Sequence, residues 1–288
     1  MRICLYWNAT AGDRVPLDDI TAAIARAGHD IKSVLKQKDD AKAALRMDVD
    51  ALVAAGGDGT VARAGRALAG SDLPMAILPL GTANNIATSL GIADDPIAAI
   101  DDWKKQKVVR IDVGVVSDGG DDHLFIEGVG TGLLPHGIKK GRNDQTDHPD
   151  ASAEVEWARD VFLDALSDLR PRHSTLRIDD EEVEGDYLLV EVLNIAAVGP
   201  RLRLSAETTP ADGFLSVVTA GAGDREAIRA HLTQSSDQHD SHAWLKSWRA
   251  TRVEVVGWHE YHVDDEVRTS PTGKLRIGIR PSSLPVMA

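Results

Sequence analysis

The chain has 288 residues, of which 43% are apolar and 27% charged, and its formal net charge is −13. This composition excludes a disordered or fibrous protein, and the length favours two globular domains over one. The negative charge argues against nucleic acid as a partner and against adhesion to an anionic membrane through overall charge, because both depend on Lys and Arg. The single Cys4 excludes an internal disulfide, and neither a signal peptide nor a membrane-spanning apolar run is found, so we expect a cytoplasmic protein.

Apolar segments alternate with helical patterns in the first third of the chain. This alternation predicts parallel strands joined by right-handed helical crossovers, with ligands bound at the carboxyl ends of the strands. The expected strands are 3–7, 31–35, 51–56 and 75–80, and the expected helices are 16–28, 40–47, 60–70 and 82–90.

The pattern changes after Val108. Short segments rich in β-branched residues follow, separated by turn residues, and they predict an antiparallel β-sandwich or barrel as a second domain. Two amphipathic helices interrupt these strands at 153–169 and 225–232, and their apolar stripes indicate packing rather than a cofactor site.

Two glycine-rich loops follow expected strands at the same edge of the predicted sheet. In ALVAAGGDGT (51–60), glycines flank Asp58 where a strand enters a helix, a place where backbone N–H groups bind phosphate. Asp58 would repel that phosphate unless a divalent cation lay between them. In LPLGTANNIATSLGI (78–92), Gly81 permits close approach of a ligand and Thr82 is a suitable N-cap. Either loop alone is equally well explained as a turn, but together they predict a site for a metal–nucleotide complex.

The sequence lacks the GxxxxGKS/T signature of P-loop nucleotidases and the HRD and DFG signatures of protein kinases. The segments GGDGTVARA (56–64) and LPLGTANNIA (78–87) instead resemble the diacylglycerol kinase catalytic-domain family, which includes bacterial diacylglycerol kinases, sphingosine kinases and ceramide kinases. The resemblance continues in WNATAGD (7–13), PADGFLSVV (210–218) and HVDDEV (262–267), so it extends along most of the chain.

The resemblance implies a fold of the α/β plus β class. It places a nucleotide-binding α/β domain with a parallel sheet at residues 1–112 and a β-sandwich domain for the lipid substrate at residues 113–276. The C-terminal tail, residues 277–288, is expected to return to the first domain.

The resemblance also implies roles for individual residues. Asp264 falls on the position of the general base, and Glu266 on that of an acid in the catalytic metal–water network that includes Asp58. A carboxylate suits the first role because it can accept the proton of a lipid hydroxyl during phosphoryl transfer, although three successive acids taken alone are more typical of an acidic turn. Asp212 matches a carboxylate that holds a structural Mg²⁺ in some bacterial members, and an Asp-Gly turn explains it equally well. The implied nucleotide ligands are Asn8, Gly56, Gly57, Asp58, Gly59, Thr60, Gly81, Thr82 and Asn85.

Three positions depart from the family pattern. Asn85 stands where many bacterial diacylglycerol kinases have an acid, and Glu127 stands where an Asn is common. Asp265 takes the place of the glycine in the family's Asp-Gly-Glu segment. These changes bear on the identity of the substrate more than on the class of reaction.

Two neighbouring features are interpreted from pattern. GVGTG (128–132) opens no clear βαβ unit, so we interpret it as a sandwich turn near the lipid site rather than as a dinucleotide fingerprint. His262 lies two residues before Asp264 and is expected on the same strand face, where it either tunes that carboxylate or packs.

The predicted function is that of an ATP-dependent kinase, using Mg²⁺ or Mn²⁺, which phosphorylates a hydroxyl of a membrane lipid at the inner membrane face. Diacylglycerol, ceramide and a sphingoid base are alternative acceptors, and a homodimer is compatible with the family. An NAD kinase shares GGDGT and the two-domain plan, but its Thr-Gly-Ser nucleoside segment is not found here. A non-catalytic nucleotide or lipid sensor of the same fold agrees with Asn85 but not with an intact Asp58 and Asp264.

Overall fold

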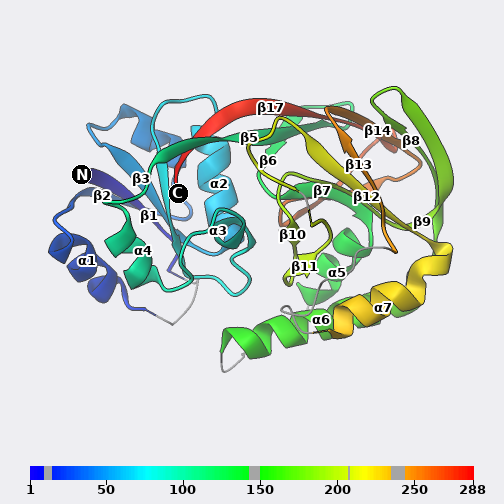
Figure 1. Ribbon diagram of the computed structural model, residues 1–288, viewed down its shortest axis with the longest axis horizontal. Coiled ribbons are helices and arrows are strands. Elements are labelled where there is room, and N and C mark those ends of the chain that lie inside the picture. Colours follow the sequence, from blue (N-terminus) through cyan, green and yellow to red (C-terminus); the bar gives the residue numbers. More distant parts are fainter. Residues whose placement is uncertain (10–14, 143–149, 207, 235–243) are drawn as a thin grey trace.

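The computed structural model describes residues 1–9, 15–142, 150–206, 208–234 and 244–288. Figure 1 shows two lobes, one of α/β type and one built mainly of strands. Two long strands, β5 (Val108–Ser117) and β17 (Lys274–Met287), run along one side of the molecule and join the lobes.

The first lobe contains a parallel sheet in the strand order β2–β1–β3–β4. Strands β1, β3 and β4 are almost wholly buried, which explains why they read as continuous apolar runs rather than as alternating patterns. The predicted α/β fold with a parallel sheet is therefore confirmed. The elements of this lobe are β1 (Arg2–Trp7), α1 (Leu17–Arg26), β2 (Asp30–Lys36), η1 (Ala41–Arg46), β3 (Ala51–Gly56), α2 (Asp58–Leu68), β4 (Met75–Pro79), α3 (Asn85–Ser89) and α4 (Pro96–Asp102).

The second lobe is an antiparallel, sandwich-like arrangement of strands with helices α5, α6 and α7 along its lower side (Figure 1). One apolar cluster fills the space between the strands, and another lies between the sheet and these helices. The predicted β-sandwich is confirmed. Its elements, besides β5 and β17, are β6 (Asp122–Phe125), β7 (Gly128–Gly132), α5 (Leu133–Gly141), α6 (Ala151–Asp168), β8 (Arg172–Ile178), β9 (Glu181–Leu193), β10 (Ala197–Val198), β11 (Leu202–Arg203), β12 (Leu215–Gly221), η2 (Ala222–Asp224), α7 (Arg225–Thr233), β13 (Lys246–Ala250), β14 (Arg252–Val256), β15 (Glu260–Val263) and β16 (Glu266–Thr269).

Strand β17 fastens the two lobes to each other. It pairs antiparallel with β14 and β5, and near its end Val286 pairs in parallel with Met75 of β4. One continuous sheet therefore runs from β16 through β17 to β2. The predicted return of the C-terminal tail to the first lobe is confirmed.

Two local predictions are wrong. The helix expected from residue 82 begins at Asn85, because Asn84 adopts a left-handed conformation with φ of 52° and its side chain bonds to Gly81 instead. Thr82 is therefore not the N-cap. GVGTG is not a turn but the buried strand β7, which pairs with β9 and β15.

No helix in the described ranges combines the length and the apolar character that are needed to cross a bilayer.

Candidate active site

The two glycine loops touch each other through bare backbone. A Cβ atom placed on Gly81 would lie 2.3 Å from the Cα atom of Gly57, and one on Gly57 would lie 3.1 Å from the Cα atom of Gly81. Gly57 has φ of −82°, so the glycine is required here by the close approach and not by a left-handed backbone. The carboxyl ends of β3 and β4 thus bring two stretches of glycine backbone into direct contact at the start of α2.

Asp58 ties these loops together. It is the first residue of α2, and its two carboxylate oxygens accept hydrogen bonds from the backbone N–H groups of Asn85 and Ile86, both at 3.0 Å. Burial raises the pKa of Asp58, while these N–H groups and the charge of Arg201 oppose that rise. The carboxylate consequently positions the start of α3.

Asn8 and Thr60 lie behind the first loop rather than on its surface. The Asn8 Nδ2 group donates to Thr60 Oγ1 at 3.2 Å, and both side chains are buried. A Cβ atom on Gly56 would lie 2.5 Å from the same Thr60 oxygen, so there is no space between them. These three expected ligands support the loop from within, which leaves Gly57, Gly59 and Gly81 as the positions that face outward.

The acidic segment forms the tight turn between β15 and β16. Val263 pairs with Glu266, and Asp264 adopts φ of 52°, so Asp264 lies beyond the end of the strand. The expectation that His262 and Asp264 share one face of an extended strand is wrong; instead, His262 Nδ1 lies 2.7 Å from the Asp264 carbonyl oxygen. Asp265 is exposed, and its Oδ2 atom would lie 2.6 Å from a Cβ atom on Gly59. The turn thus meets the first glycine loop directly.

The Asp264 carboxylate is fully buried and has a partner at each oxygen. Its Oδ1 accepts the backbone N–H groups of Ile126 at 3.0 Å and Glu127 at 2.9 Å, and its Oδ2 forms an ion pair with Arg66. Burial raises the pKa of Asp264, and the positive charge of Arg66 opposes this. Arg66 also contacts Glu266 at 3.4 Å, so a single guanidinium from α2 holds two acids of the opposite lobe.

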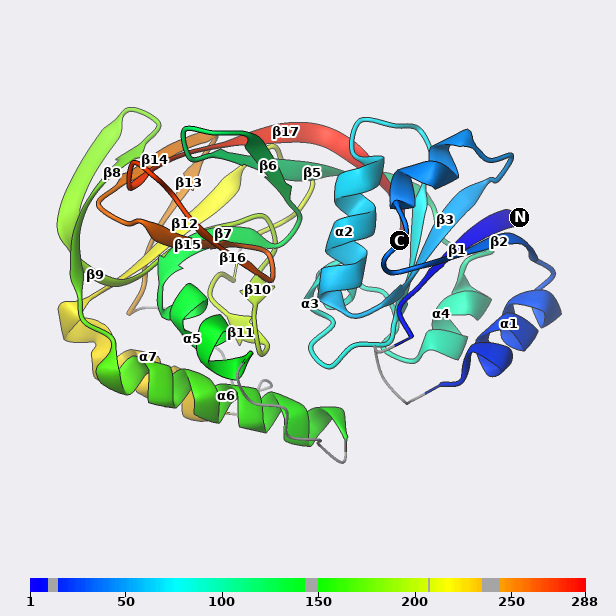
Figure 2. The same cartoon turned by 180° about the vertical axis from the view of Figure 1, so that it is seen from behind.

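Figure 2 shows α2 at the junction between the lobes, which places Arg66 where it can reach the acidic turn. Arg66 was not among the site residues expected from the sequence. No local signal distinguishes it from Arg63, an exposed arginine on the same helix.

Glu127 is the second buried acid of this junction. It lies between β6 and β7, is 5% exposed, and its Oε1 atom has no hydrogen-bond partner among the described residues. Burial and the negative charges of Asp58 and Asp264 raise the pKa of Glu127 well above its usual range. The Asn85 amide group acts in the opposite direction and lowers this pKa. The sequence analysis noted Glu127 as a departure from the family pattern, but did not assign it to the site.

A buried Glu–His pair lies beneath the acidic turn. His262 Nε2 is 2.8 Å from Glu191 Oε2, and both side chains are at most 2% exposed. A Cβ atom on Gly130 would lie 2.1 Å from the Glu191 carboxyl group, so a glycine in β7 makes room for it. The pair connects the core of the second lobe to the backbone of Asp264.

The second glycine loop is held by residues of the second lobe. Arg201 donates to the carbonyl oxygens of Thr82 at 3.0 Å and Ala83 at 3.1 Å, and the Thr82 hydroxyl donates to Glu154 of α6. A cavity of about 530 Å³ lies beside this contact, and its polar lining is formed by Asn85, Thr88, Ser89, Asp94, Arg201, Arg203 and Thr208. Its lining includes Ala83 and Asn85, which belong to the second glycine loop.

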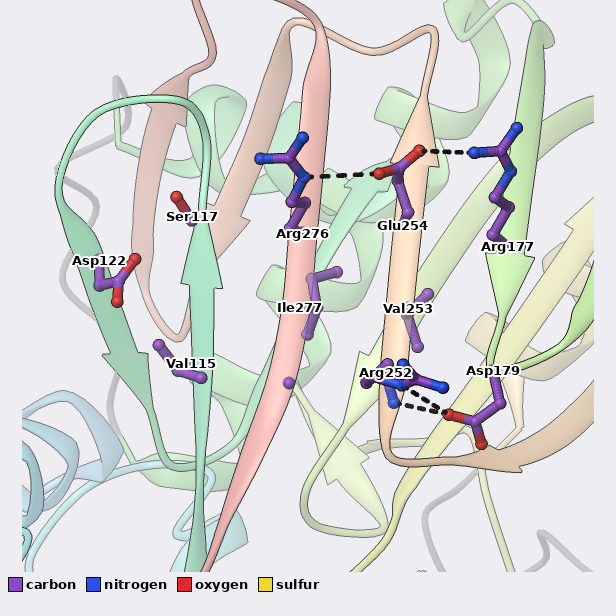
Figure 3. Close-up of a pocket in the computed structure, with 11 residues that line it drawn as sticks. Val115, Ser117, Asp122, Arg177, Asp179, Arg252, Val253, Glu254, Arg276 and Ile277 are labelled. Atoms are coloured by element: carbon purple, nitrogen blue, oxygen red, sulfur yellow. Dashed lines mark hydrogen bonds and ion pairs between the residues drawn. The ribbon is translucent and has the colours of Figure 1, made fainter.

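A different depression, shown in Figure 3, lies on the outer face of the second lobe. It has a volume of about 360 Å³ and is lined by residues of β5, β6, β8, β14 and β17. Its most prominent feature is Glu254, which pairs with Arg177 and Arg276. It shares no lining residue with the glycine loops or the acidic turn, so we assign it no part in the site.

The expected metal-binding residues do not form a complete cage. In the described part of the chain, no three His, Cys, Asp or Glu side chains are grouped closely enough to hold an ion by themselves. Asp212 lies in the turn before β12, where its carboxylate accepts the Phe214 N–H at 3.0 Å and pairs with Arg249 at 2.8 Å. Glu266 is half-buried and pairs with Arg66 and Arg268. A cation at the junction would therefore require phosphate oxygens and water in addition to protein carboxylates.

The fold and the site agree with two family models. Residues 3–116 match the diacylglycerol kinase catalytic domain, and residues 143–288 match the YegS C-terminal NAD kinase beta sandwich-like domain. The chain belongs to the diacylglycerol kinase catalytic-domain family, and the class that this family defines is that of the lipid kinases.

Two similar proteins are named as lipid kinases, one of them as a probable one. A diacylglycerol kinase of Mycobacterium tuberculosis is 29% identical over 245 residues, covering 82% of this chain and 74% of its own. A probable lipid kinase YegS-like protein of Klebsiella pneumoniae is 27% identical over 247 residues, covering 84% of this chain and 78% of its own.

Solved structures show the same fold at low sequence identity. A putative diacylglycerol kinase from Bacillus anthracis superposes with a TM-score of 0.76 at 19% identity, covering 99% of this chain and 94% of its own. An NAD kinase from Archaeoglobus fulgidus in complex with ATP gives a TM-score of 0.58 at 14% identity, covering 100% of this chain and 94% of its own. At these identities the likeness concerns the fold alone.

Proposed function

We propose that the protein transfers the γ-phosphoryl group of ATP to a hydroxyl group of a membrane lipid, with diacylglycerol as the leading acceptor. One observation carries this proposal: the contact between Gly57 and Gly81 forms a bare backbone surface directly opposite the acidic turn 264–266 of the second lobe. This arrangement supports the proposal because phosphates bound to the glycine backbone would lie across one junction from a group of carboxylates.

The nucleotide phosphates bind along the outward-facing glycines of the two loops. Gly57 and Gly59 bring peptide N–H groups to the N-terminus of α2, where the helix dipole favours negative charge. Gly81 adds a second segment of backbone from the end of β4. The cavity beside Asn85 and Arg201 adjoins this surface and offers space for the rest of the nucleotide.

A divalent cation, Mg²⁺ or Mn²⁺, fits the charge of the junction. Asp58 and Asp264 lie close enough to the buried Glu127 to raise the pKa of its carboxyl group, and the Oε1 atom of Glu127 has no partner in the described part of the chain. Asp58 and Glu266 are the residues that we propose to hold the cation, together with phosphate oxygens and water. When bound, the cation neutralises the negative charge of the β- and γ-phosphates. We propose no second cation at Asp212, because Arg249 already neutralises that carboxylate.

We assign the role of general base to Asp264. The two backbone N–H groups at Oδ1 fix its orientation, while Arg66 is the one partner of Oδ2 among the residues that the structure describes. Because Arg66 also contacts Glu266, it can shift toward that acid and leave Oδ2 to accept the proton of the lipid hydroxyl. Asp265 is exposed beside Gly59 and serves as the comparison residue for this assignment.

Family membership favours a lipid acceptor over NAD. The relatives in M. tuberculosis and K. pneumoniae are named a diacylglycerol kinase and a probable lipid kinase, whereas the NAD kinase similarity is limited to the fold. A lipid acceptor requires the protein to work at a membrane surface, so we also propose peripheral binding to a bilayer during turnover. Ceramide and sphingoid bases are the acceptors to compare with diacylglycerol.

The test is a direct assay of phosphoryl transfer. The full chain is incubated with Mg²⁺ and γ-labelled ATP in mixed micelles of diacylglycerol, ceramide or sphingosine, and in parallel with NAD. We expect label in a lipid, most rapidly in diacylglycerol, and none in NAD. Labelled NADP without labelled lipid would establish the NAD kinase alternative, and ATP binding without any labelled acceptor would favour a sensor.

A further inference from the structure

Glu127 has a free carboxyl oxygen at a place where proteins rarely leave one. Its side chain is 5% exposed, and Oε1 has no hydrogen-bond partner among the described residues. The three charges that act on it most strongly are those of Asp58, Asp264 and Asp265, all of them negative. An acid without a counter-charge is strongly disfavoured in such surroundings unless a ligand supplies the missing positive charge.

The backbone of Glu127 shows that its position is built and not accidental. Its N–H group donates to Asp264 at 2.9 Å, and its carbonyl oxygen accepts the Asn194 N–H at 2.8 Å. Both main-chain groups are therefore satisfied, and the segment between β6 and β7 is fixed from either side. The carboxyl oxygen Oε1 is the part of the residue that remains available.

Asn85 brings Glu127 into the phosphate site. The Asn85 amide group lowers the pKa of the Glu127 carboxyl group, which places the two side chains near each other, and it donates to the Gly199 carbonyl oxygen at 2.9 Å. Its backbone N–H is bound by Asp58. Asn85, Asp58 and Glu127 thus form one contact group across the two lobes, in which the amide comes from the first lobe and the additional acid from the second.

We propose that Glu127 is a cation-binding residue of this site, whose Oε1 atom joins Asp58 and Glu266 as a protein ligand of the nucleotide-bound divalent cation. Relative to the family pattern, the acid and the amide have exchanged places. Glu127 supplies the carboxylate that is usual at position 85, and Asn85 supplies the amide that is usual at position 127. The inference rests on the proposed binding of a metal–nucleotide complex, but not on the identity of the acceptor.

If Glu127 had a purely structural role, its replacement would change the stability of the protein in a different way. A buried acid that serves packing would be expected to satisfy both oxygens within the protein, and its replacement by Gln would then break a hydrogen bond and lower stability. A cation ligand whose Oε1 atom has no partner among the described residues predicts the opposite for the cation-free protein. Glu127→Gln should unfold at the same temperature as the wild type or higher, because the change removes an uncompensated acid.

The test measures binding of Mn²⁺ to the full chain in the presence of a non-hydrolysable ATP analogue, by electron paramagnetic resonance. Four proteins are compared: the wild type, Glu127→Gln, the exchange variant Asn85→Asp with Glu127→Asn, and Asp118→Asn as a matched control. Asp118 is also a buried acid, but it binds Tyr261 Oη at 2.8 Å and the Gly120 N–H at 3.0 Å, away from the loops.

We expect Glu127→Gln to weaken Mn²⁺ binding at least ~10-fold, the range found when residues that support a metal are replaced. The exchange variant should recover most of this loss, and Asp118→Asn should bind Mn²⁺ like the wild type. Wild-type affinity in Glu127→Gln, or no recovery in the exchange variant, overturns the assignment. If Glu127→Gln folds poorly, the structural role is established instead and the proposal fails.

The outcome is independent of the acceptor assay. If the protein phosphorylates diacylglycerol but Glu127→Gln binds Mn²⁺ as tightly as the wild type, the proposed function stands and the proposed role of Glu127 is wrong. If the four proteins bind Mn²⁺ as expected but no lipid is phosphorylated, the proposed role of Glu127 stands and the proposed lipid acceptor is wrong.

Discussion

Arg66 of α2 forms an ion pair with Asp264 of the opposite lobe, 198 positions later in the chain. The Asp264 side chain is fully buried and the Arg66 side chain is 19% exposed, so this pair is largely shielded from water. The strand β17 joins the lobes covalently and by hydrogen bonds, whereas this pair joins them at the centre of the junction. It also controls the oxygen of Asp264 that we propose to act as a base.

Replacing Arg66 with Met should destabilise the protein strongly. The change leaves the Asp264 carboxylate buried without its counter-charge, and the loss of one partner of a buried pair typically costs about 3–5 kcal/mol. Urea unfolding at neutral pH measures this change in the free energy of unfolding. The matched control is Arg63→Met on the same helix, where Arg63 is exposed and donates to the Gln37 carbonyl oxygen at 3.1 Å. Equal stability of the two variants would show that the pair does not connect the lobes.

Replacing Gly81 with Val should abolish nucleotide binding. A Cβ atom there would lie 2.3 Å from the Gly57 Cα atom, so the two loops must separate and the phosphate surface is lost. Gly57→Val should weaken binding too, since its Cβ atom lies 3.1 Å from Gly81 Cα and projects into the same surface. Calorimetry with Mg²⁺ and ATP provides the measurement. Gly223→Ala is the control, because no atom lies within 4 Å of the added Cβ; unchanged ATP affinity in a folded Gly81→Val protein would place the phosphates elsewhere.

The buried pair of His262 and Glu191 should make stability depend on pH. The Asp264 carbonyl oxygen can only accept, so His262 Nδ1 carries a proton, and a second proton is held between Nε2 and Glu191. Although burial opposes the imidazolium, the Glu191 carboxylate raises the pKa of His262, and burial raises the pKa of Glu191. The folded state therefore keeps a proton that the unfolded chain loses near pH ~6.5.

The sign of this effect follows from proton linkage. A raised folded pKa gives stability that is fully present below pH ~6.5 and is lost as the pH rises through the folded value, with a slope of up to ~1.4 kcal/mol per pH unit. Urea unfolding between pH 6 and 9 should show this decline in the wild type. The double variant Glu191→Gln with His262→Gln should show a smaller decline, and identical slopes would mean that the pair holds no additional proton.

The sequence predicted the parts of the site that depend on local pattern. Glycines at the ends of β3 and β4 were expected at one edge of the sheet because parallel strands end there, and the contact between Gly57 and Gly81 agrees with that expectation. The start of α3 was misplaced because the Asn84 side chain bonds to Gly81, an alternative to helix capping that propensity does not reveal.

The contacts across the junction were not predictable in the same way. Arg66, Glu127 and Glu191 each acquire their importance from a partner far away in the sequence, and each looks locally like an ordinary helix or strand residue. Glu127 alone gave a signal, as a departure from the family pattern. Burial of these charged groups is a tertiary property, and only the three-dimensional structure shows which of them have partners.

The central claim is that this junction transfers a phosphoryl group with Asp264 as the base, and steady-state kinetics of Asp264→Asn with diacylglycerol tests it most directly. The amide keeps the shape of the side chain but cannot accept the proton, so kcat should fall by about 10²–10⁴-fold while the affinity for ATP changes little. Asp265→Asn, at the exposed position of the same turn, should retain most of the wild-type kcat. If Asp264→Asn keeps the wild-type kcat, or if Asp265→Asn alone abolishes turnover, Asp264 is not the base and the account of the site is contradicted.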